Sequence, residues 1–210
     1  PTVATFLLSF YLPLHDTRAL TYPPLASPIP FGYGGDRAGN NLFSNSLVAV
    51  DIRSGEYRWH FQQVHHDLWD YDAPNPVILF DMEYQGVTRQ ALANAGKTGW
   101  VYILDRVTGE PIIGIEEKPV MQLEEQLTSP TQPYPVGDSF VPQFIDIPFE
   151  GVTLVNQGRI FTPFGINTPT MVQPSPAGSA NWPPSAYDPT RNTMYICAAE
   201  TGMTLKQEKE

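Results

Sequence analysis

Short segments of alternating apolar and polar residues recur along the chain, and helical periodicity is nearly absent. The best amphipathic helical window spans residues 116–127 and is short. By contrast, Ser46–Val50 and Tyr57–Phe61 are strand-like and flank Asp51–Gly55, a polar segment that ends in glycine. This arrangement predicts a β-hairpin.

Further apolar segments follow at intervals of about 11 residues, with turn-forming residues between them. These segments are Val77–Phe80, Thr88–Ala93, Trp100–Leu104 and Pro111–Ile115. Short strands at regular spacing predict an antiparallel sandwich, a barrel or a propeller.

A repeated motif favours the propeller. Residues 49–59 and 104–111 both consist of a strand, an Asp-x-x-Ser/Thr-Gly turn and a second strand, and residues 187–197 hold a weaker third copy. The Asp accepts N–H groups within the turn and the Gly supplies a positive φ, so each copy closes a hairpin. Because a closed ring has about 4–8 blades, we expect only about two to three of them here. The expected blades span roughly 1–62, 77–115 and 159–200, with a long surface excursion over 116–150.

Composition agrees with short strands joined by many turns, because the 210 residues include 22 Pro and 16 Gly. The formal net charge of −10 argues against a nucleic-acid partner, which needs a clustered basic face.

The lone Cys197 excludes an internal disulfide and a multi-thiolate metal site, and we expect it to be buried in the apolar strand 194–198. The segment Thr2–Leu14 lacks the basic start of a signal peptide. We expect the chain to be a piece of a longer polypeptide.

The densest group of polar and aromatic side chains lies between two predicted strands, at His65–Asp72. One interpretation is a surface loop with a buried Trp. The other is a site for a metal and a base, because Asp70 and Asp72 would share one side of an extended segment and carboxylates bind hard cations such as Ca²⁺ or a lanthanide. Zinc binding by His65 and His66 is disfavoured, since adjacent residues in a strand point to opposite faces.

The run from Asn45 to Ile112 resembles the pyrroloquinoline quinone (PQQ)-dependent dehydrogenases, above all their glucose/quinate dehydrogenase-like branch and related alcohol dehydrogenases. The resemblance rests on His-His-Asp-Leu-Trp-Asp-Tyr-Asp and on Gly-Lys-Thr-Gly with the following Leu-Asp-Arg-x-Thr-Gly-Glu-Pro, and it extends to Tyr33–Arg37 and Gly178–Pro189. It implies an all-β fold, part of an eight-bladed β-propeller with tryptophan-docking repeats. Trp59 is then expected to dock between blades.

The resemblance also implies an oxidoreductase that oxidises an alcohol, polyol or sugar hydroxyl with PQQ as hydride acceptor. Asp70 matches the catalytic base, which lies beside PQQ and a Ca²⁺ or lanthanide ion that acts as Lewis acid. Asp72 matches an additional metal ligand of lanthanide-using members. Lys97 matches the cation that contacts the quinone oxygens, and Asn181 matches another contact to the cofactor.

The sequence departs from the family at two positions. Ser27 stands in an Ala-Ser-Pro turn where members often carry a metal-binding Asn, and Phe10 stands near the place of the Trp beneath PQQ. The implied partners are the remaining propeller blades, a small alcohol or sugar substrate, and an electron acceptor such as cytochrome c or ubiquinone. The implied location is the periplasm, or a membrane facing it.

A competing interpretation is a non-catalytic propeller that serves as a binding scaffold, since such propellers share the docking repeat. Retention of Asp70, Asp72 and Lys97 favours the enzyme. In isolation, the 210-residue piece is expected to hold no cofactor and to be inactive.

Overall fold

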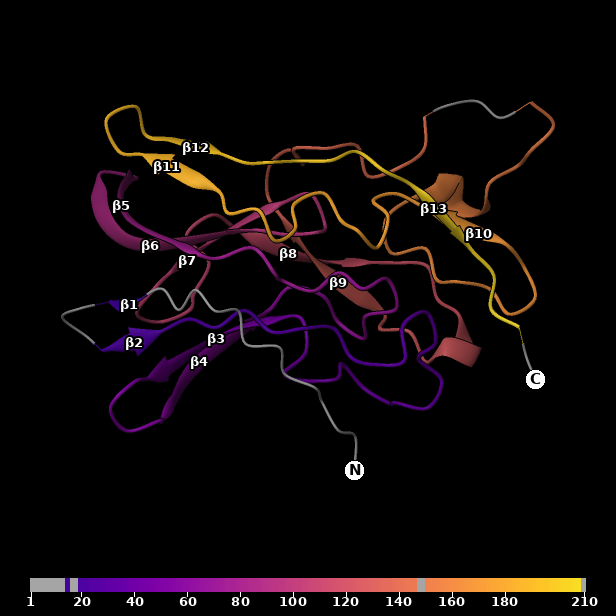
Figure 1. Cartoon of the computed structure of the whole chain (residues 1–210), viewed down its shortest axis with the longest axis horizontal. Coiled ribbons are helices and arrows are strands. Elements are labelled where there is room, and N and C mark those ends of the chain that lie inside the picture. The colour runs from indigo at the N-terminus through magenta and orange to yellow at the C-terminus, as the bar shows by residue number, and fades with distance from the viewer. Residues whose placement is uncertain (1–13, 16–18, 147–149, 209–210) are drawn as a thin grey trace.

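Short antiparallel strands make up most of the regular structure in the computed structural model, which describes residues 14–15, 19–146 and 150–208 (Figure 1). The strands are β1 (Leu14–His15), β2 (Leu20–Thr21), β3 (Ser46–Asp51), β4 (Tyr57–Gln62), β5 (Ile78–Tyr84), β6 (Val87–Ala95), β7 (Val101–Asp105), β8 (Ile115–Pro119), β9 (Thr131–Pro135), β10 (Thr170–Val172), β11 (Ala186–Asp188), β12 (Thr193–Tyr195) and β13 (Met203–Leu205). The 3₁₀ helices η1 (Glu124–Gln126) and η2 (Val155–Gly158) complete the elements. Within the described residues no helix is long and apolar enough to cross a membrane. The all-β class expected from the sequence is confirmed.

The predicted hairpin is β3–β4, at one edge of a sheet with the order β1-β2-β3-β4. Its turn and the two related turns are closed by Asp51, Asp105 and Asp188. In each, Oδ1 of the aspartate accepts the N–H groups two and three residues later, at 2.8–3.3 Å. Gly55 and Gly109 follow with φ of 74° and 79°. The repeat therefore forms the same turn each time, as the sequence predicts.

The second sheet has the order β5-β6-β7 and contains the next predicted strands. The expected strand at 111–115 is wrong. Pro111 makes only an isolated bridge to Leu104, the Ile112 N–H donates to the Ile103 carbonyl at 3.0 Å, and the next strand, β8, begins only at Ile115.

The segment expected as a surface excursion contains a hairpin, in which β8 pairs with β9 and Ile115 lies opposite Pro135. Gln126 and Gln132 on this segment are buried. The excursion is thus attached to the rest of the fold by polar side chains, while the expected blade boundaries stay a prediction.

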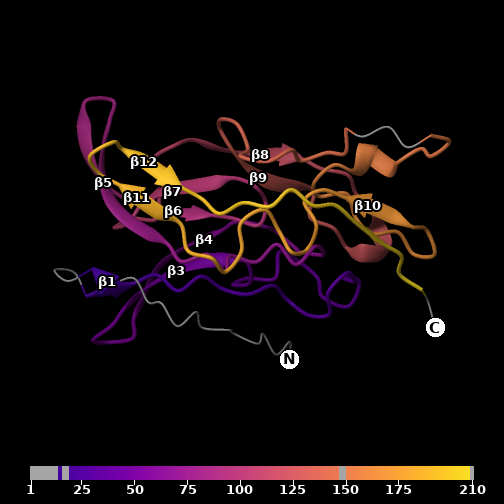
Figure 2. The same ribbon diagram turned by 45° about the horizontal axis from the view of Figure 1, so that its top comes forward.

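In Figure 1 the sheet β1–β4, the sheet β5–β7 and the hairpin β11–β12 follow one another from bottom to top, and in Figure 2 the hairpin overlaps the sheet β5–β7. Trp59 of β4 is buried against the turn after β7, where a Cβ on Gly109 would lie 2.6 Å from the Trp59 ring. The rings of Phe80 on β5 and Tyr187 on β11 lie 4.7 Å apart. Trp59 docks between successive sheets as expected, and the stack is part of a β-propeller.

Cys197 lies on the surface, so the expectation of a buried thiol is wrong. β12 pairs only with β11 among the described strands and ends at Tyr195, before the cysteine. An apolar strand pattern predicts burial only where another layer covers the strand.

A cluster of buried residues is formed by the loop that joins β4 to β5 together with the segments packed against it. It contains Trp69, Tyr71, Trp100 and Phe161, with the rings of Trp69 and Phe161 5.4 Å apart. These aromatic residues form the apolar support on which the candidate site is built.

Candidate active site

The loop between β4 and β5 is folded around the carboxylate of Asp67, which is 2 % exposed. Oδ1 accepts the Trp69 N–H at 2.8 Å, and Oδ2 accepts the Tyr71 N–H at 2.9 Å. His66 and Asp70 have φ of 46° and 62°. The expectation of an extended segment with alternating side chains is therefore wrong, because hydrogen bonds to Asp67 turn the backbone.

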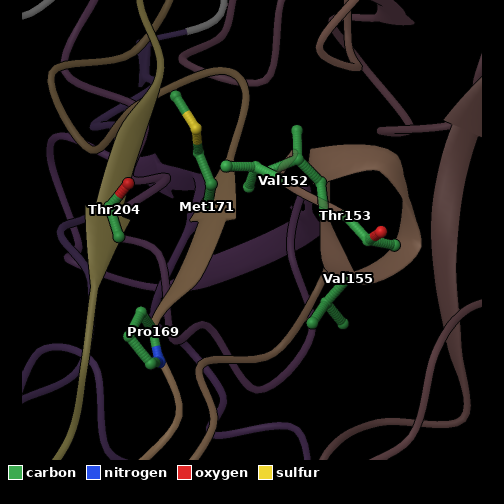
Figure 3. Close-up of a pocket in the computed structure, with 7 residues that line it drawn as sticks. Val152, Thr153, Val155, Pro169, Met171 and Thr204 are labelled. Carbon is green, nitrogen blue, oxygen red and sulfur yellow. The ribbon is translucent and has the colours of Figure 1, made fainter. Parts of the chain in front are cut away.

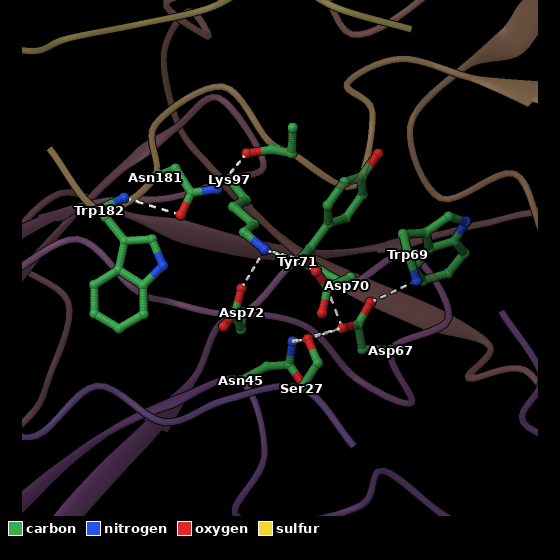
Figure 4. A network of polar contacts seen from close by, with 11 residues as sticks. Ser27, Asn45, Asp67, Trp69, Asp70, Tyr71, Asp72, Lys97, Asn181 and Trp182 are labelled. Atoms are coloured by element: carbon green, nitrogen blue, oxygen red, sulfur yellow. Dashed lines mark hydrogen bonds and ion pairs between the residues drawn. The ribbon is translucent and has the colours of Figure 1, made fainter. Parts of the chain in front are cut away.

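Asp70 and Asp72 nevertheless converge on one partner, the amine of Lys97 (Figure 4). Lys97 Nζ donates to Asp70 Oδ2 at 2.9 Å and to the Asp70 carbonyl at 2.8 Å. It lies 2.6 Å from Asp72 Oδ1. The side chain of Lys97 is 6 % exposed, that of Asp72 19 % and that of Asp70 43 %. Of the three charged groups, Asp70 is thus the most accessible from solvent.

Lys97 reaches the acids from the turn that follows β6. The Gly96 N–H donates to the Trp100 carbonyl at 2.9 Å and closes this turn. The aliphatic stem lies against Gly178, which has φ of +75° and where a Cβ would stand 2.2 Å from Lys97 Cγ. The Ser179 N–H donates to the Lys97 carbonyl at 2.9 Å. The lysine is therefore held between its own turn and the loop after β10.

Burial and charge act in opposite directions within this cluster. Burial raises the pKa of Asp72 from 3.8 to about 6, although the Lys97 amine lowers it. Burial lowers the pKa of Lys97, but the carboxylates of Asp72 and Asp70 outweigh burial and leave that pKa above its ordinary value. Lys97 is therefore a firmly protonated amine at neutral pH.

Asn181 lies on the loop that packs on Lys97, but its side chain is used within that loop. Nδ2 donates to the Ala177 carbonyl at 2.7 Å, and Oδ1 accepts the Trp182 N–H at 2.9 Å. Trp182 is 54 % exposed and lines a cavity of about 30 Å³ together with Asp72. The loop thus brings an exposed aromatic ring and an amide to the edge of the acid–lysine cluster.

Ser27, expected as a metal ligand, contacts Asp67 rather than the acids at 70 and 72. Its hydroxyl donates to Asp67 Oδ2 and lies 3.1 Å from Asn45 Nδ2. Phe10 lies outside the described residues. The structure therefore brings together Asp70, Asp72 and Lys97, but it gives Ser27 another partner.

The described residues contain no group of at least three His, Cys, Asp or Glu side chains placed to hold a metal ion. Asp70 and Asp72 offer carboxylate oxygens, the donors that hard cations prefer, and this donor set fits part of a Ca²⁺ or lanthanide site. His65 is bound by Gln62 and Glu117, and His66 is buried between backbone carbonyl groups. The histidines therefore help to pack the loop.

A separate hollow of about 270 Å³ lies between η2, β10 and β13 (Figure 3). Val152, Val155 and Met171 contribute its apolar walls, and no predicted site residue lines it. The acid–lysine cluster is therefore the better candidate for chemistry.

The sequence did not single out Asp67, Gln126 or Gln132, which hold the loop in place. Gln132 bonds both backbone groups of His65, at 2.8 Å to the N–H and 2.7 Å to the carbonyl. Gln126 accepts the Gly34 N–H at 2.8 Å. A signal existed only for Asp67, which accepts the N–H group two residues later, as the aspartates of the repeated turns do, and then the N–H group four residues later.

Docked sheets that share a repeated turn, with two acids and a lysine gathered on neighbouring loops, define a segment of a β-propeller. The sequence model described as "PQQ: Glucose/ethanol/alcohol dehydrogenase, beta-propeller domain" matches residues 13–210. The chain belongs to this family of PQQ β-propeller domains.

Curated relatives agree with this assignment. A glycerol dehydrogenase large subunit from Gluconobacter thailandicus is 33 % identical over 193 residues, which cover 83 % of this chain and 26 % of the relative. A quinoprotein glucose dehydrogenase from Gluconobacter oxydans is 34 % identical over 196 residues, which cover 84 % of this chain and 24 % of the relative. The chain thus spans about a quarter of the length of these relatives.

A solved structure supports the fold. The europium-containing methanol dehydrogenase superposes with a TM-score of 0.69 at 20 % identity, over 95 % of this chain and 31 % of that chain.

Proposed function

We propose that the complete protein carrying this chain oxidises the hydroxyl group of a small alcohol, polyol or sugar with PQQ, and that Asp70 is its general base. The single observation that carries the proposal is the pairing of Asp70 Oδ2 with Lys97 Nζ at 2.9 Å within a PQQ propeller domain. The chain supplies about a quarter of such an enzyme, so the activity belongs to the whole protein.

Asp70 has the properties that a general base needs. Its carboxylate is 43 % exposed in this chain, and the Lys97 amine lies 2.9 Å from Oδ2, so one face of the carboxylate is free to meet a substrate hydroxyl. The Asp70 carbonyl accepts from the same amine, which fixes the residue's backbone as well as its side chain. A base held in this way is oriented before the substrate arrives.

Lys97 provides a buried positive charge next to the base. In this structure its amine contacts Asp70 and Asp72, and in the proposed holoenzyme Lys97 would be the residue that contacts the quinone oxygens. A protonated amine at this place stabilises negative charge that develops beside it. PQQ, when bound, supplies the redox chemistry by accepting a hydride.

Asp70 and Asp72 are the residues of this chain that would hold a Ca²⁺ or lanthanide ion, with the other ligands supplied by the rest of the protein. Asn181 and Phe10 are proposed to contact the cofactor, and Ser27 is a proposed metal ligand beside its bond to Asp67. The proposed electron acceptor is cytochrome c or ubiquinone, and the proposed location is the periplasm or a membrane that faces it.

The test is Asp70→Asn in the complete protein. The amide keeps the size of the side chain but cannot accept a proton, so turnover should fall by about a hundredfold or more. PQQ binding, measured by absorbance titration, should persist. Asp81→Asn is the control, because Asp81 is 57 % exposed and pairs with Arg106 away from the site. Wild-type turnover in Asp70→Asn would refute the assignment and favour the scaffold interpretation.

A further inference from the structure

We propose that Asp67 is the positioning residue for Asp70. In this proposal its buried carboxylate holds the backbone on both sides of Asp70 and thereby aims the Asp70 carboxylate at Lys97. The inference rests on the proposed function of Asp70, and it concerns how that residue is held rather than what it does.

Asp67 grips the loop at the two residues that flank Asp70. The Trp69 N–H donates to Oδ1 at 2.8 Å, and the Tyr71 N–H donates to Oδ2 at 2.9 Å. One carboxylate therefore binds the peptide group that follows Asp70 and the peptide group that precedes Trp69. Hydrogen bonds to a carboxylate are the stronger kind, so Asp67 holds this part of the loop backbone firmly.

These two hydrogen bonds matter because Asp70 has φ of 62°, in the left-handed region that residues other than glycine seldom adopt. This turned backbone is what lets both the carbonyl and Oδ2 of Asp70 accept from one amine, at 2.8 Å and 2.9 Å. In an extended backbone the carbonyl and the side chain would diverge. The conformation persists where the surroundings hold it, and Asp67 supplies such a hold.

Asp67 is itself fixed from outside the loop. Asn45 Nδ2 donates to its Oδ2 at 2.8 Å, and the Ser27 hydroxyl donates to the same oxygen. Arg37 Nη2 donates to the Asp67 carbonyl at 2.8 Å. At 2 % exposure the carboxylate is removed from bulk water, and Ser27 and Asn45 provide hydrogen bonds in its place. Through Asp67, the position of Asp70 thus depends on the segment that contains Ser27, Arg37 and Asn45.

A purely structural role is the competing explanation, since Trp69 and Tyr71 are also anchored by their side chains. Both are 1 % exposed, and Trp69 Nε1 donates to the Thr162 carbonyl at 2.7 Å. If that anchoring sufficed, loss of Asp67 would lower stability without changing the chemistry. The experiment must separate these two outcomes.

The test compares Asp67→Ala and Asp67→Asn in the complete protein, with Asp105→Ala as matched control. Asp105 is also a carboxylate that accepts nearby backbone N–H groups, at 2.8 Å and 3.1 Å, but in a turn away from the site. Amide hydrogen exchange over residues 67–72, measured by mass spectrometry without PQQ, reports whether Asp67 holds the loop backbone. Turnover and KM of the PQQ-loaded protein report the orientation of the Asp70 carboxylate, and absorbance titration reports PQQ affinity.

Asp67→Ala should speed exchange in residues 67–72 by about tenfold or more, because charge-assisted hydrogen bonds are lost. It should lower kcat by about a hundredfold with KM and PQQ affinity nearly unchanged, since a small displacement of a reacting group has that effect. Asp67→Asn should restore part of both properties, because its amide oxygen still accepts one N–H. Asp105→Ala should keep wild-type kcat.

Unchanged exchange in residues 67–72, or a kcat that falls only in proportion to the folded fraction, would overturn the positioning role. If Asp67→Ala does not fold, Asp67→Asn carries the test by the same two readouts. Full turnover of Asp70→Asn would instead refute the proposed function, while the exchange result would still report whether Asp67 holds the loop.

Discussion

Replacing Lys97 by Met should change how the stability of the protein depends on pH. Methionine keeps an unbranched stem that packs on Gly178 but removes the charge that faces Asp70 and Asp72. The buried Asp72 then has no cation to pair with. Its carboxyl group will take up a proton rather than remain charged in an apolar site.

The magnitude follows from the pKa of Asp72, which burial raises from 3.8 to about 6 while Lys97 is present. Because the folded state binds the proton more tightly, the free energy of unfolding of the wild type falls as pH rises from about 4 to about 6, and this group has no further effect above that. Without Lys97 the pKa of Asp72 rises further. The fall then continues above pH 6, at up to about 1.4 kcal/mol for each pH unit.

The titration of Lys97 itself contributes little to the difference in free energy of unfolding between wild type and Lys97→Met. Its pKa lies above the ordinary value, so the stabilisation from its charge is fully present below about pH 10 and is lost only as pH rises through the folded-state pKa. Its hydrogen bonds to the partly exposed Asp70 add about 1 kcal/mol at any pH between 5 and 8. The gap between wild type and Lys97→Met should therefore be small and constant below pH 6 and widen above it.

The assay is urea unfolding of the chelator-treated protein from pH 5 to pH 8, so that no bound cation competes with the lysine. Lys118→Met is the control, because Lys118 pairs with Glu116 at 3.3 Å on the surface and both side chains are about half exposed. That variant should lose less than about 0.5 kcal/mol at every pH. A Lys97→Met gap of equal size at pH 5 and pH 7.5 would refute the coupling between Asp72 and Lys97.

Two further variants test the packing around the site. Gly109→Ala should lower the free energy of unfolding by about 1–3 kcal/mol, because φ is +79° and a Cβ would meet the Trp59 ring, whereas Gly55→Ala in the matching turn, with nothing within 4 Å, should lose less. Equal thermal shifts for the two would contradict the docking of Trp59. Gln132→Ala should cost about 2–3 kcal/mol, because it leaves both backbone groups of His65 without their partner, and unchanged urea unfolding would exclude that anchoring role.

Much of the fold follows from local sequence. Asp51, Asp105 and Asp188 each bond amides two and three residues away, so the motif carries its own turn wherever it stands. The β3–β4 pairing depends on a short connection and was predictable for the same reason. Trp59 was also predictable as a docking residue, because it follows the turn at a fixed spacing and large rings are buried where another layer lies close.

The site was predictable only in its composition. The acids at 70 and 72 and the lysine at 97 were identified as residues that act together, and the structure brings their side chains together. An extended backbone was the wrong reason, since Asp70 has φ of 62°. Ser27 shows the same limit, because its bond to Asp67 joins residues 40 positions apart.

The sequence by itself determined the all-β class, the repeated turn and the residue types that can exchange a proton, because these depend on contacts between near neighbours or on chemistry within one side chain. Only the tertiary structure decided that Asp67 is buried, that Gln132 reaches His65 across 67 residues, and that Cys197 is exposed. Those outcomes depend on which distant segments pack together, and burial and pairing of polar groups are properties of the packed assembly rather than of any one segment.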